Sequence, residues 1–219
     1  YNISREAQDE FAFNSHQKAI LANNNGAFVN EISPITTIEN SYSLESNEYI
    51  SNSNFVSQDE GPREDTSLEV LGKLRTVFAQ NGSVTAGNSS QMSDAAAAVL
   101  VASEEAVEKY NLTPKAEFMD FSVAGVPAEI MGIGPVKAIP KVLKSVSLSL
   151  DDIGWIELNE AFAAQSLAVI NELGLNPEIV NPLGGAIALG HPLGATGAIR
   201  IATILSAMQR ENIDYGMVL

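Results

Sequence analysis

Residues 184–197 read GGAIALGHPLGATG, and this stretch carries most of the information about fold and function. Five of its fourteen residues are glycines set among apolar residues, which predicts a tightly folded, buried loop. His191 stands between Gly190 and Pro192, and the proline restricts the backbone of the histidine before it. A histidine held in this way suits a base or donor with a pKa near neutrality, with a purely structural histidine as the alternative.

The loop excludes two common nucleotide-binding motifs, because it contains neither G-x-G-x-x-G nor a Lys-Ser/Thr pair. Around it, patterning predicts helices over 93–110, 135–144, 160–173 and 198–208, and strands over 115–124, 155–158 and 215–219. Strands that alternate with helices at this spacing predict an α/β domain from about residue 93 onward.

The first third of the chain begins with an amphipathic pattern over residues 1–30. Ser4 is the expected N-cap, Ala7, Phe11 and Ala19–Ala22 form the apolar face, and the Asn-Asn-Asn-Gly run 23–26 ends the helix. His16 on this helix is interpreted as structural. Residues 31–60, rich in Ser, Asn and Glu, predict an exposed excursion with weak strands, with a disordered linker as the alternative. A second helix is predicted over 66–79, followed by a turn at Asn81–Gly82.

Two further segments interrupt the pattern of helices and strands. Residues 85–90, TAGNSS, are small and polar, so a ligand could approach the backbone closely; the alternative is a capped tight turn. Residues 159–165, NEAFAAQ, begin where the predicted buried strand ends, and ligands of α/β sheets usually bind at such strand ends. Asn159 could donate a hydrogen bond into a pocket there, or it could simply cap the helix.

Composition limits the possible partners. The 219 residues carry a net charge of −15, which argues against nucleic acid and anionic membrane surfaces but allows a phosphorylated small ligand. The longest apolar run is far too short to span a bilayer. With no cysteine and two histidines, disulfides are excluded and a metal site is not expected. The chain starts at Tyr1 and stops in a predicted strand, so we expect an incomplete piece of a longer protein.

Taken together, these segments resemble the thiolase family. The matching blocks stand in family order: residues 85–90, 131–135 (MGIGP), 159–165 and 184–197. The resemblance implies an α/β fold of two similar halves, each a five-stranded sheet flanked by helices, with a CoA-covering loop domain inserted in the first. On that fold, 1–92 would be most of the loop domain, 93–114 the last helix of the N-terminal half, and 115–219 a truncated C-terminal half.

The resemblance also implies a mechanism. In thiolases a cysteine attacks the ketone carbon of a 3-ketoacyl-CoA, acetyl-CoA leaves, and a second CoA takes the acyl group from the enzyme. By match, His191 activates the nucleophile and helps to form an oxyanion hole, while Asn159 holds a water that completes the hole. Both family cysteines are absent from this chain, one expected upstream and one just beyond Leu219. The piece alone is therefore predicted to be inactive.

Substrate contacts carry over in the same way. The pantetheine arm would contact Ser90, Phe78 and Phe162, the nucleotide end Arg63, the acyl group Met131, and the CoA or acyl moiety Gly190. For the aromatic residues and the methionine, core packing is the alternative. One family contact falls on Val70, whose side chain cannot form a hydrogen bond. CoA is a substrate here, and no cofactor is expected.

The sequence of residues 181–185, NPLGG, favours a degradative 3-ketoacyl-CoA thiolase of fatty-acid β-oxidation. An acetoacetyl-CoA-forming thiolase and a non-catalytic thiolase-like acyl-CoA or lipid carrier are the alternatives. Asn159 speaks against a ketoacyl-carrier-protein synthase, which places a second histidine there. For the full-length protein, the resemblance implies a homodimer or homotetramer. A further subunit of the β-oxidation pathway is a second expected partner. The expected location is soluble and intracellular: the cytoplasm in bacteria, the mitochondrion or peroxisome in eukaryotes.

Overall fold

The structure is a computed structural model that describes all residues 1–219. The helices are α1 (Arg5–Asn24), α2 (Leu68–Gly72), α3 (Glu104–Tyr110), α4 (Gly134–Ser145), α5 (Ala163–Leu173), α6 (Ala186–Leu189) and α7 (Thr196–Glu211). The strands are β1 (Ile35–Ser43), β2 (Glu48–Val56), β3 (Trp155–Glu157) and β4 (Gly216–Val218). Three short 3-10 turns are η1 (Ala86–Asn88), η2 (Ala128–Ile133) and η3 (Leu150–Asp152). No helix combines the length and the apolar character that a membrane crossing requires.

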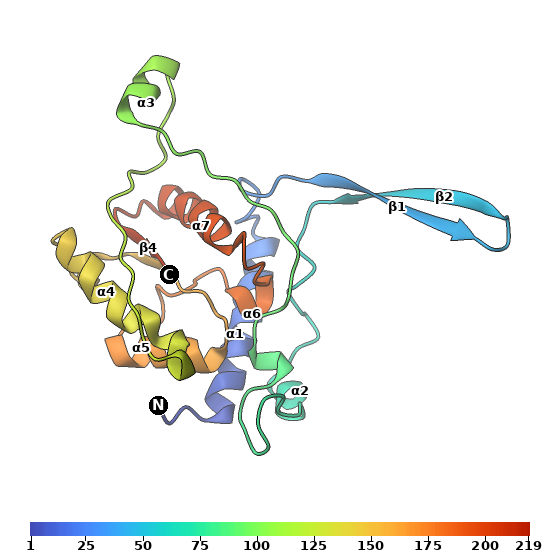
Figure 1. The fold of residues 1–219 in the computed structure, drawn as a ribbon, viewed down its shortest axis with the longest axis horizontal. Coiled ribbons are helices and arrows are strands. Elements are labelled where there is room, and N and C mark those ends of the chain that lie inside the picture. Colours follow the sequence, from blue (N-terminus) through green and yellow to red (C-terminus); the bar gives the residue numbers. More distant parts are fainter.

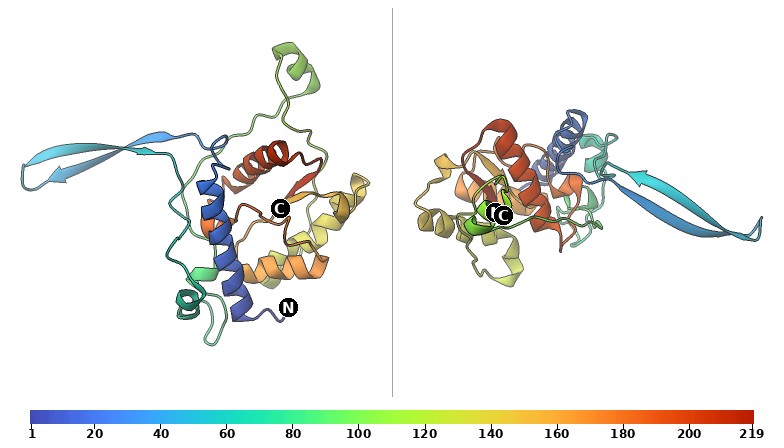
Figure 2. Two further views of the ribbon diagram at one scale, coloured as in Figure 1. Left: turned by 180° about the vertical axis from the view of Figure 1, so that it is seen from behind. Right: turned by 90° about the horizontal axis from the view of Figure 1, so that it is seen from above.

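The body of the molecule is an α/β unit around the parallel pair β3 and β4, which confirms the predicted class. Trp155 pairs with Gly216, Ile156 with Met217 and Glu157 with Val218. Helices α4, α5 and α7 lie around this pair in the views from the front and from behind (Figures 1 and 2). The main core cluster joins the strands to α4 and α5 and contains Ile139, Leu143, Ile153, Ile156, Leu158, Val169, Ile170, Leu175, Val180 and Met217.

Helix α1 forms where the sequence predicts it. The Ser4 hydroxyl accepts a hydrogen bond from Ala7 N at 3.1 Å, as expected of an N-cap, and the helix ends within the Asn-Asn-Asn-Gly run. Its inner face is made of small alanines, Ala12, Ala19 and Ala22, together with buried polar residues. The small side chains let α6 pack close to α1, so the glycine-rich loop rests on the first helix of the chain.

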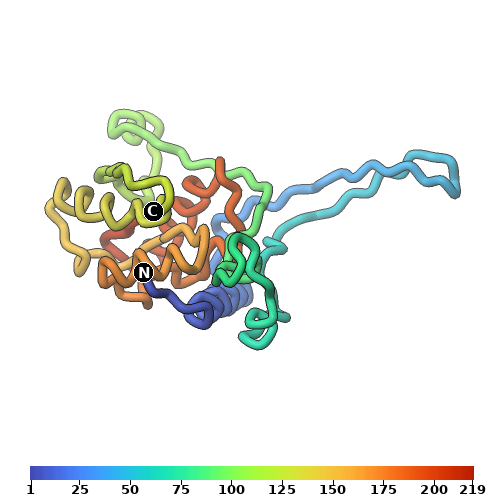
Figure 3. Tube along the Cα trace, turned by 60° about the horizontal axis from the view of Figure 1, so that its bottom comes forward, coloured from blue at the N-terminus to red at the C-terminus, as the bar shows by residue number.

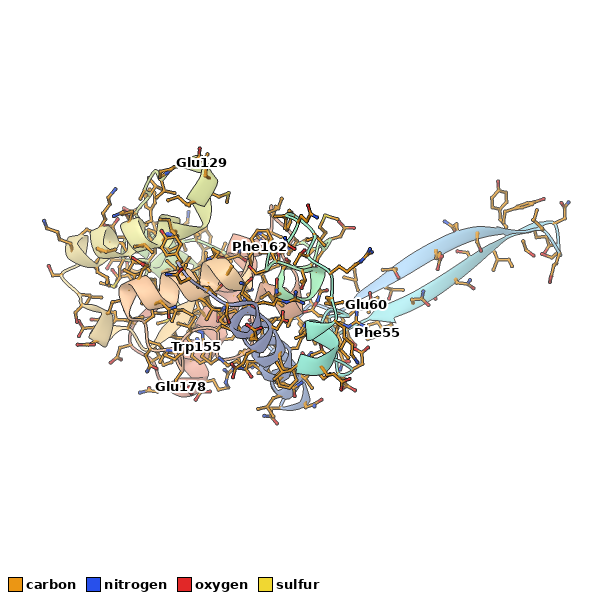
Figure 4. All side chains as sticks on the ribbon, turned by 90° about the horizontal axis from the view of Figure 1, so that it is seen from below. Phe55, Glu60, Glu129, Trp155, Phe162 and Glu178 are labelled. Carbon is orange, nitrogen blue, oxygen red and sulfur yellow. The ribbon has the colours of Figure 1, made fainter.

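Strands β1 and β2 form an antiparallel ribbon that projects from the body (Figure 1). Every residue of β2, and all of β1 except Ser43, is exposed, and side chains stand out from both faces along its length (Figure 4). This confirms the exposed excursion with strands and excludes the disordered linker.

Three predicted elements are wrong. The helix over 66–79 is limited to α2, because Val77 N donates to Val84 O at 3.1 Å and the intervening residues turn back as a small hairpin around Asn81–Gly82. The helix over 93–110 is reduced to α3, with residues 93–103 extended and Leu100 and Val101 exposed. A helix that is apolar on all sides forms only where other elements cover it.

The predicted strand over 115–124 is also absent. Its alternating apolar residues, such as Phe118 and Phe121, are exposed, and no neighbouring strand pairs with them. A strand needs a partner for its backbone hydrogen bonds, so alternation alone does not produce one. Figure 1 shows this yellow-green part of the chain running from α3 along the body to α4, and the tube view shows the green chain before α3 as a similar extended connection (Figure 3).

Candidate active site

His191 lies two residues after α6, in the middle of the glycine-rich loop. Gly190 before it has φ of 91°, a conformation that suits glycine, and a Cβ there would overlap the Ser93 side chain. The His191 backbone N–H donates to Gln91 O at 3.1 Å. The two ring nitrogens have separate neighbours: Nδ1 is 2.8 Å from Thr196 Oγ1, and Nε2 is 3.3 Å from Asn159 Nδ2. The imidazole is therefore held from its backbone and from both ring nitrogens.

Asn159 follows β3, at the carboxyl end of the strand, where ligands of α/β sheets usually bind. Its backbone N–H donates to Leu219 O at 3.1 Å, which extends the pairing of β3 with β4. The interpretation of Asn159 as a helix cap is wrong, because α5 has Phe162 at its N-cap and no side chain caps it. The Asn159 side chain instead faces the imidazole, and its Oδ1 is buried without a hydrogen-bond partner.

The electrostatic surroundings keep the imidazole neutral. Burial lowers the pKa of His191, and the nearby Arg200 cation lowers it further. Arg200 itself is paired with Glu157 of β3 at 3.0 Å, and both side chains are almost completely buried. A neutral imidazole at pH 7 has a free lone pair, which is the form that a general base requires.

The glycine-rich loop is fixed by Glu160, a buried carboxylate without a cation beside it. Ser15 Oγ donates to it at 2.7 Å, Asn181 Nδ2 at 2.8 Å and Ile187 N at 3.2 Å. A Cβ on Gly185 would overlap the Glu160 carboxyl group. The carboxylate thus ties the loop to α1 and to the end of β3, and the Gly-Gly pair is the sequence signal for this close approach.

Gln91 is a second residue that holds the glycine-rich loop in place, and the sequence analysis did not identify it. Its Nε2 donates to Gly61 O at 2.9 Å and to Ile187 O at 3.0 Å, while its backbone oxygen accepts from His191 N. One residue therefore holds α6, the backbone of His191 after it, and the loop segment that contains Gly61. No local pattern around Gln91 points to this, because its partners lie 30 and 96 residues away.

The segment 85–90 is a self-capped 3-10 turn, which agrees with the tight-turn alternative. Thr85 N donates to Asn88 Oδ1 at 2.8 Å, and Asn88 Nδ2 donates to Asp9 Oδ1 at 2.9 Å, so the turn is anchored to α1. Ser90 N donates to Ala161 O at 3.0 Å. The turn therefore runs beside the NEAF segment, next to Asn159.

The predicted substrate residues fall into two groups. Phe78 and Phe162 form an edge-to-face pair with ring centroids 5.7 Å apart, and Phe162 lies at the start of α5 (Figure 4). Arg63 and Met131 are 63% and 74% exposed, and neither side chain forms a hydrogen bond with His191 or Asn159. The Arg63 guanidinium pairs instead with Asp65 at 3.0 Å.

His16 has the structural role that its position on α1 predicts. The side chain is buried, burial lowers its pKa, and Nδ1 accepts a hydrogen bond from Arg63 N at 3.1 Å. His16 therefore fixes the backbone at Arg63, and His191 is the one histidine that faces the candidate site. Val70 is half-exposed on α2.

Comparison with known proteins gives a consistent result over the whole chain. The family model described as "Thiolase, N-terminal domain" matches residues 1–105, and "Thiolase, C-terminal domain" matches residues 112–219. The 3-ketoacyl-CoA thiolase of Bacillus subtilis (strain 168) is 48% identical over 222 residues, covering 100% of this chain and 56% of that protein.

Solved structures agree. The crystal structure of the Bacillus anthracis acetyl-CoA acetyltransferase has a TM-score of 0.93 and 42% identity, covering 100% of this chain and 53% of that one. The human mitochondrial 3-ketoacyl-CoA thiolase in complex with CoA has a TM-score of 0.85 and 40% identity, covering 98% and 51%. The chain thus spans about half the length of the proteins it matches, and the fold expected from the sequence is confirmed.

Proposed function

Because the chain belongs to the thiolase family, we propose that it forms the histidine- and asparagine-bearing part of a 3-ketoacyl-CoA thiolase, an acetyl-CoA C-acyltransferase. The proposed reaction is the thiolytic cleavage of a 3-ketoacyl-CoA into acetyl-CoA and a shortened acyl-CoA, in fatty-acid β-oxidation. The observation that carries this proposal is the approach of Asn159 Nδ2 to His191 Nε2 at 3.3 Å, at the end of β3.

The geometry supports the chemistry as follows. A neutral Nε2 can take the proton of an attacking thiol, and the resulting N–H can then donate to the thioester oxygen as negative charge develops there. The Asn159 amide supplies a second donor, directly or through a water. A donor preaimed in this way lowers the barrier by about 3–4 kcal/mol. The 219 residues contain no cysteine, so the nucleophile and the second catalytic cysteine must come from outside them.

The substrate contacts remain part of the proposal. The edge-to-face pair of Phe78 and Phe162, beside the turn that ends at Ser90, would contact the pantetheine arm. Arg63, exposed to solvent, would meet the phosphate or adenine end, and Met131, also exposed, would border the acyl group. Gly190 would contact the CoA or acyl moiety through its backbone, because Ser93 occupies the space that a Cβ would need. The solved relative with CoA bound supports CoA as the ligand class.

The whole protein is proposed to be a homodimer or homotetramer in a soluble intracellular compartment, with the loop domain over 1–92 and the two thiolase halves meeting near residue 114. The family models that end at residue 105 and begin at residue 112 support this boundary.

The proposal is tested in a chimera, in which this chain replaces the aligned segment of the Bacillus subtilis relative. We expect the chimera to cleave 3-ketoacyl-CoA and His191→Ala to reduce kcat/KM by at least about 100-fold, the low end for a general base. The control is His16→Asn, in which Oδ1 can accept the Arg63 N–H in place of Nδ1, and which should keep its activity. Near-normal turnover of His191→Ala would refute the assignment.

The structural match to an acetyl-CoA acetyltransferase favours one second candidate, an acetoacetyl-CoA-forming enzyme. The two differ in substrate length. Faster cleavage of a long-chain 3-ketoacyl-CoA than of acetoacetyl-CoA supports the degradative enzyme, and the reverse supports the second candidate. A chimera that binds acyl-CoA without any turnover would support a carrier and contradict both.

A further inference from the structure

The Thr196 hydroxyl occupies a defined position beside the candidate base. Thr196 is the first residue of α7 and is buried, and its Oγ1 is 2.8 Å from His191 Nδ1 and 3.0 Å from Pro192 O. A carbonyl oxygen can only accept, so the hydroxyl donates its proton to Pro192. The lone pair that remains on Oγ1 then faces Nδ1, which must carry a proton to complete the hydrogen bond.

The carbonyl that receives the hydroxyl proton is fixed in space. The backbone N–H groups of Ala195 and Thr196 donate to Pro192 O at 2.7 and 2.9 Å, as part of the turn that starts α7. The N-cap of this helix, Ala195, has no side-chain cap, so the Pro192 carbonyl is the anchor of the first turn. The hydroxyl orientation is thus set by the helix start rather than by the imidazole.

We propose that Thr196 is a positioning residue that holds His191 in the Nδ1–H tautomer and so keeps Nε2 free to take a proton. A neutral imidazole carries its proton on one nitrogen, and the hydrogen bond made by the other nitrogen selects which. A lone pair on Nε2 also fits its neighbour, because Asn159 Nδ2 can only donate. The tautomer assignment deepens the proposed function, since only the free Nε2 faces Asn159 and can act as the base there.

The tautomer can be measured in the chimera, labelled with ¹⁵N at histidine. The His191→Ala chimera identifies the His191 signals by their loss. Long-range ¹H–¹⁵N NMR spectra at pH 8 should show the Nδ1–H tautomer of His191. In Thr196→Val, which keeps the shape and removes the hydroxyl, Nε2–H should appear, and Thr196→Ser should restore Nδ1–H. A wild-type His191 in the Nε2–H form, or an unchanged tautomer in Thr196→Val, would overturn the proposal.

The chimera provides a kinetic readout that a packing role would not give. Loss of the hydrogen bond between His191 Nδ1 and the Thr196 hydroxyl should lower kcat by about 5- to 10-fold in Thr196→Val, with KM little changed. The activity of Thr196→Ser should stay near that of wild type. An unchanged kcat in a folded Thr196→Val chimera contradicts the role. If the chimera is inactive altogether, the proposed function fails while the NMR result still decides the tautomer.

Discussion

Arg200→Met should be among the most damaging single substitutions in this chain, because it would leave the Glu157 carboxylate buried without a cation. Arg200 Nη1 lies 3.0 Å from Glu157 Oε2, and the side chains are 4% and 0% exposed. Burial raises the pKa of Glu157, while Arg200 and the Trp155 indole, which donates to Oε1 at 2.7 Å, lower it. Removal of the arginine therefore removes the larger of the two interactions that lower the pKa of Glu157.

The expected loss follows from the distance. At 3.0 Å and an effective dielectric constant of about 20, the attraction is about 5 kcal/mol, and breaking a buried pair typically costs about 3–5 kcal/mol. Against a total stability of about 5–15 kcal/mol, this is a large fraction. The paired variant Glu157→Gln/Arg200→Met should recover most of it, because the glutamine is neutral and its Oε1 can still accept from the Trp155 indole.

The measurement is urea unfolding followed by the fluorescence of Trp155, the single tryptophan. In Arg200→Met the buried carboxyl must be protonated, so its folded-state pKa lies above the unfolded value. The folded state then binds the additional proton, and stability present at low pH is lost as the pH rises through the folded pKa. The difference in unfolding free energy between Arg200→Met and wild type should therefore be largest at pH 8. A variant within about 1 kcal/mol of wild type at pH 8, or a paired variant no more stable than the single one, would contradict this reasoning.

Three shorter predictions follow from other buried groups and from the aromatic pair. Burial raises the pKa of Glu31 to about 7, so ionisation costs stability as pH rises from about 4.5 to 7. Glu31→Gln should unfold at higher urea than wild type at pH 8, and the difference should shrink towards pH 5. Gly185→Ala, which drives a Cβ into the Glu160 carboxyl, should cost about 3 kcal/mol or more in the same assay, whereas Gly197→Ala meets no atom within 4 Å and should be neutral or stabilising. Phe78→Ala, at a side chain 72% exposed, should change stability by less than about 0.5 kcal/mol but raise the KM for CoA in the chimera.

The elements that could be predicted from sequence are those whose sequence signals are clear and whose packing partners lie within this chain. The Ser4 cap and the Asn-Gly stop of α1, and the short apolar runs of β3 and β4, are satisfied by neighbours within the chain. The apolar residues of 93–103 and 115–124 carry equally clear patterns, but these patterns specify a helix or strand only when another surface covers them. Hydrophobic periodicity shows that a segment needs an apolar surface to cover it, but it does not show whether the chain contains that surface.

The candidate site could be predicted in part. His191 and Asn159 stand in segments whose composition is unusual, and their side chains lie together as the hypothesis requires. The residues that fix them, Gln91, Glu160 and Thr196, were missed as individual residues. Gln91 and Glu160 act through contacts with distant parts of the chain, such as Ser15 with Glu160, 145 residues apart. Thr196 is only five residues from His191, but a hydroxyl at that spacing is not a recognised signal.

The link between Ser15 and the glycine-rich loop has a consequence for how such proteins can diverge. Ser15 Oγ accepts from Gly185 N at 3.0 Å and donates to Glu160, while a Cβ on Gly184 would come within 2.6 Å of Ser15 O. Exchanges in α1 and in the loop are therefore expected to show epistasis, with a change in one tolerated only alongside a compensating change in the other. Homologous recombination between relatives with a crossover between residues 15 and 184 would therefore separate co-adapted residues.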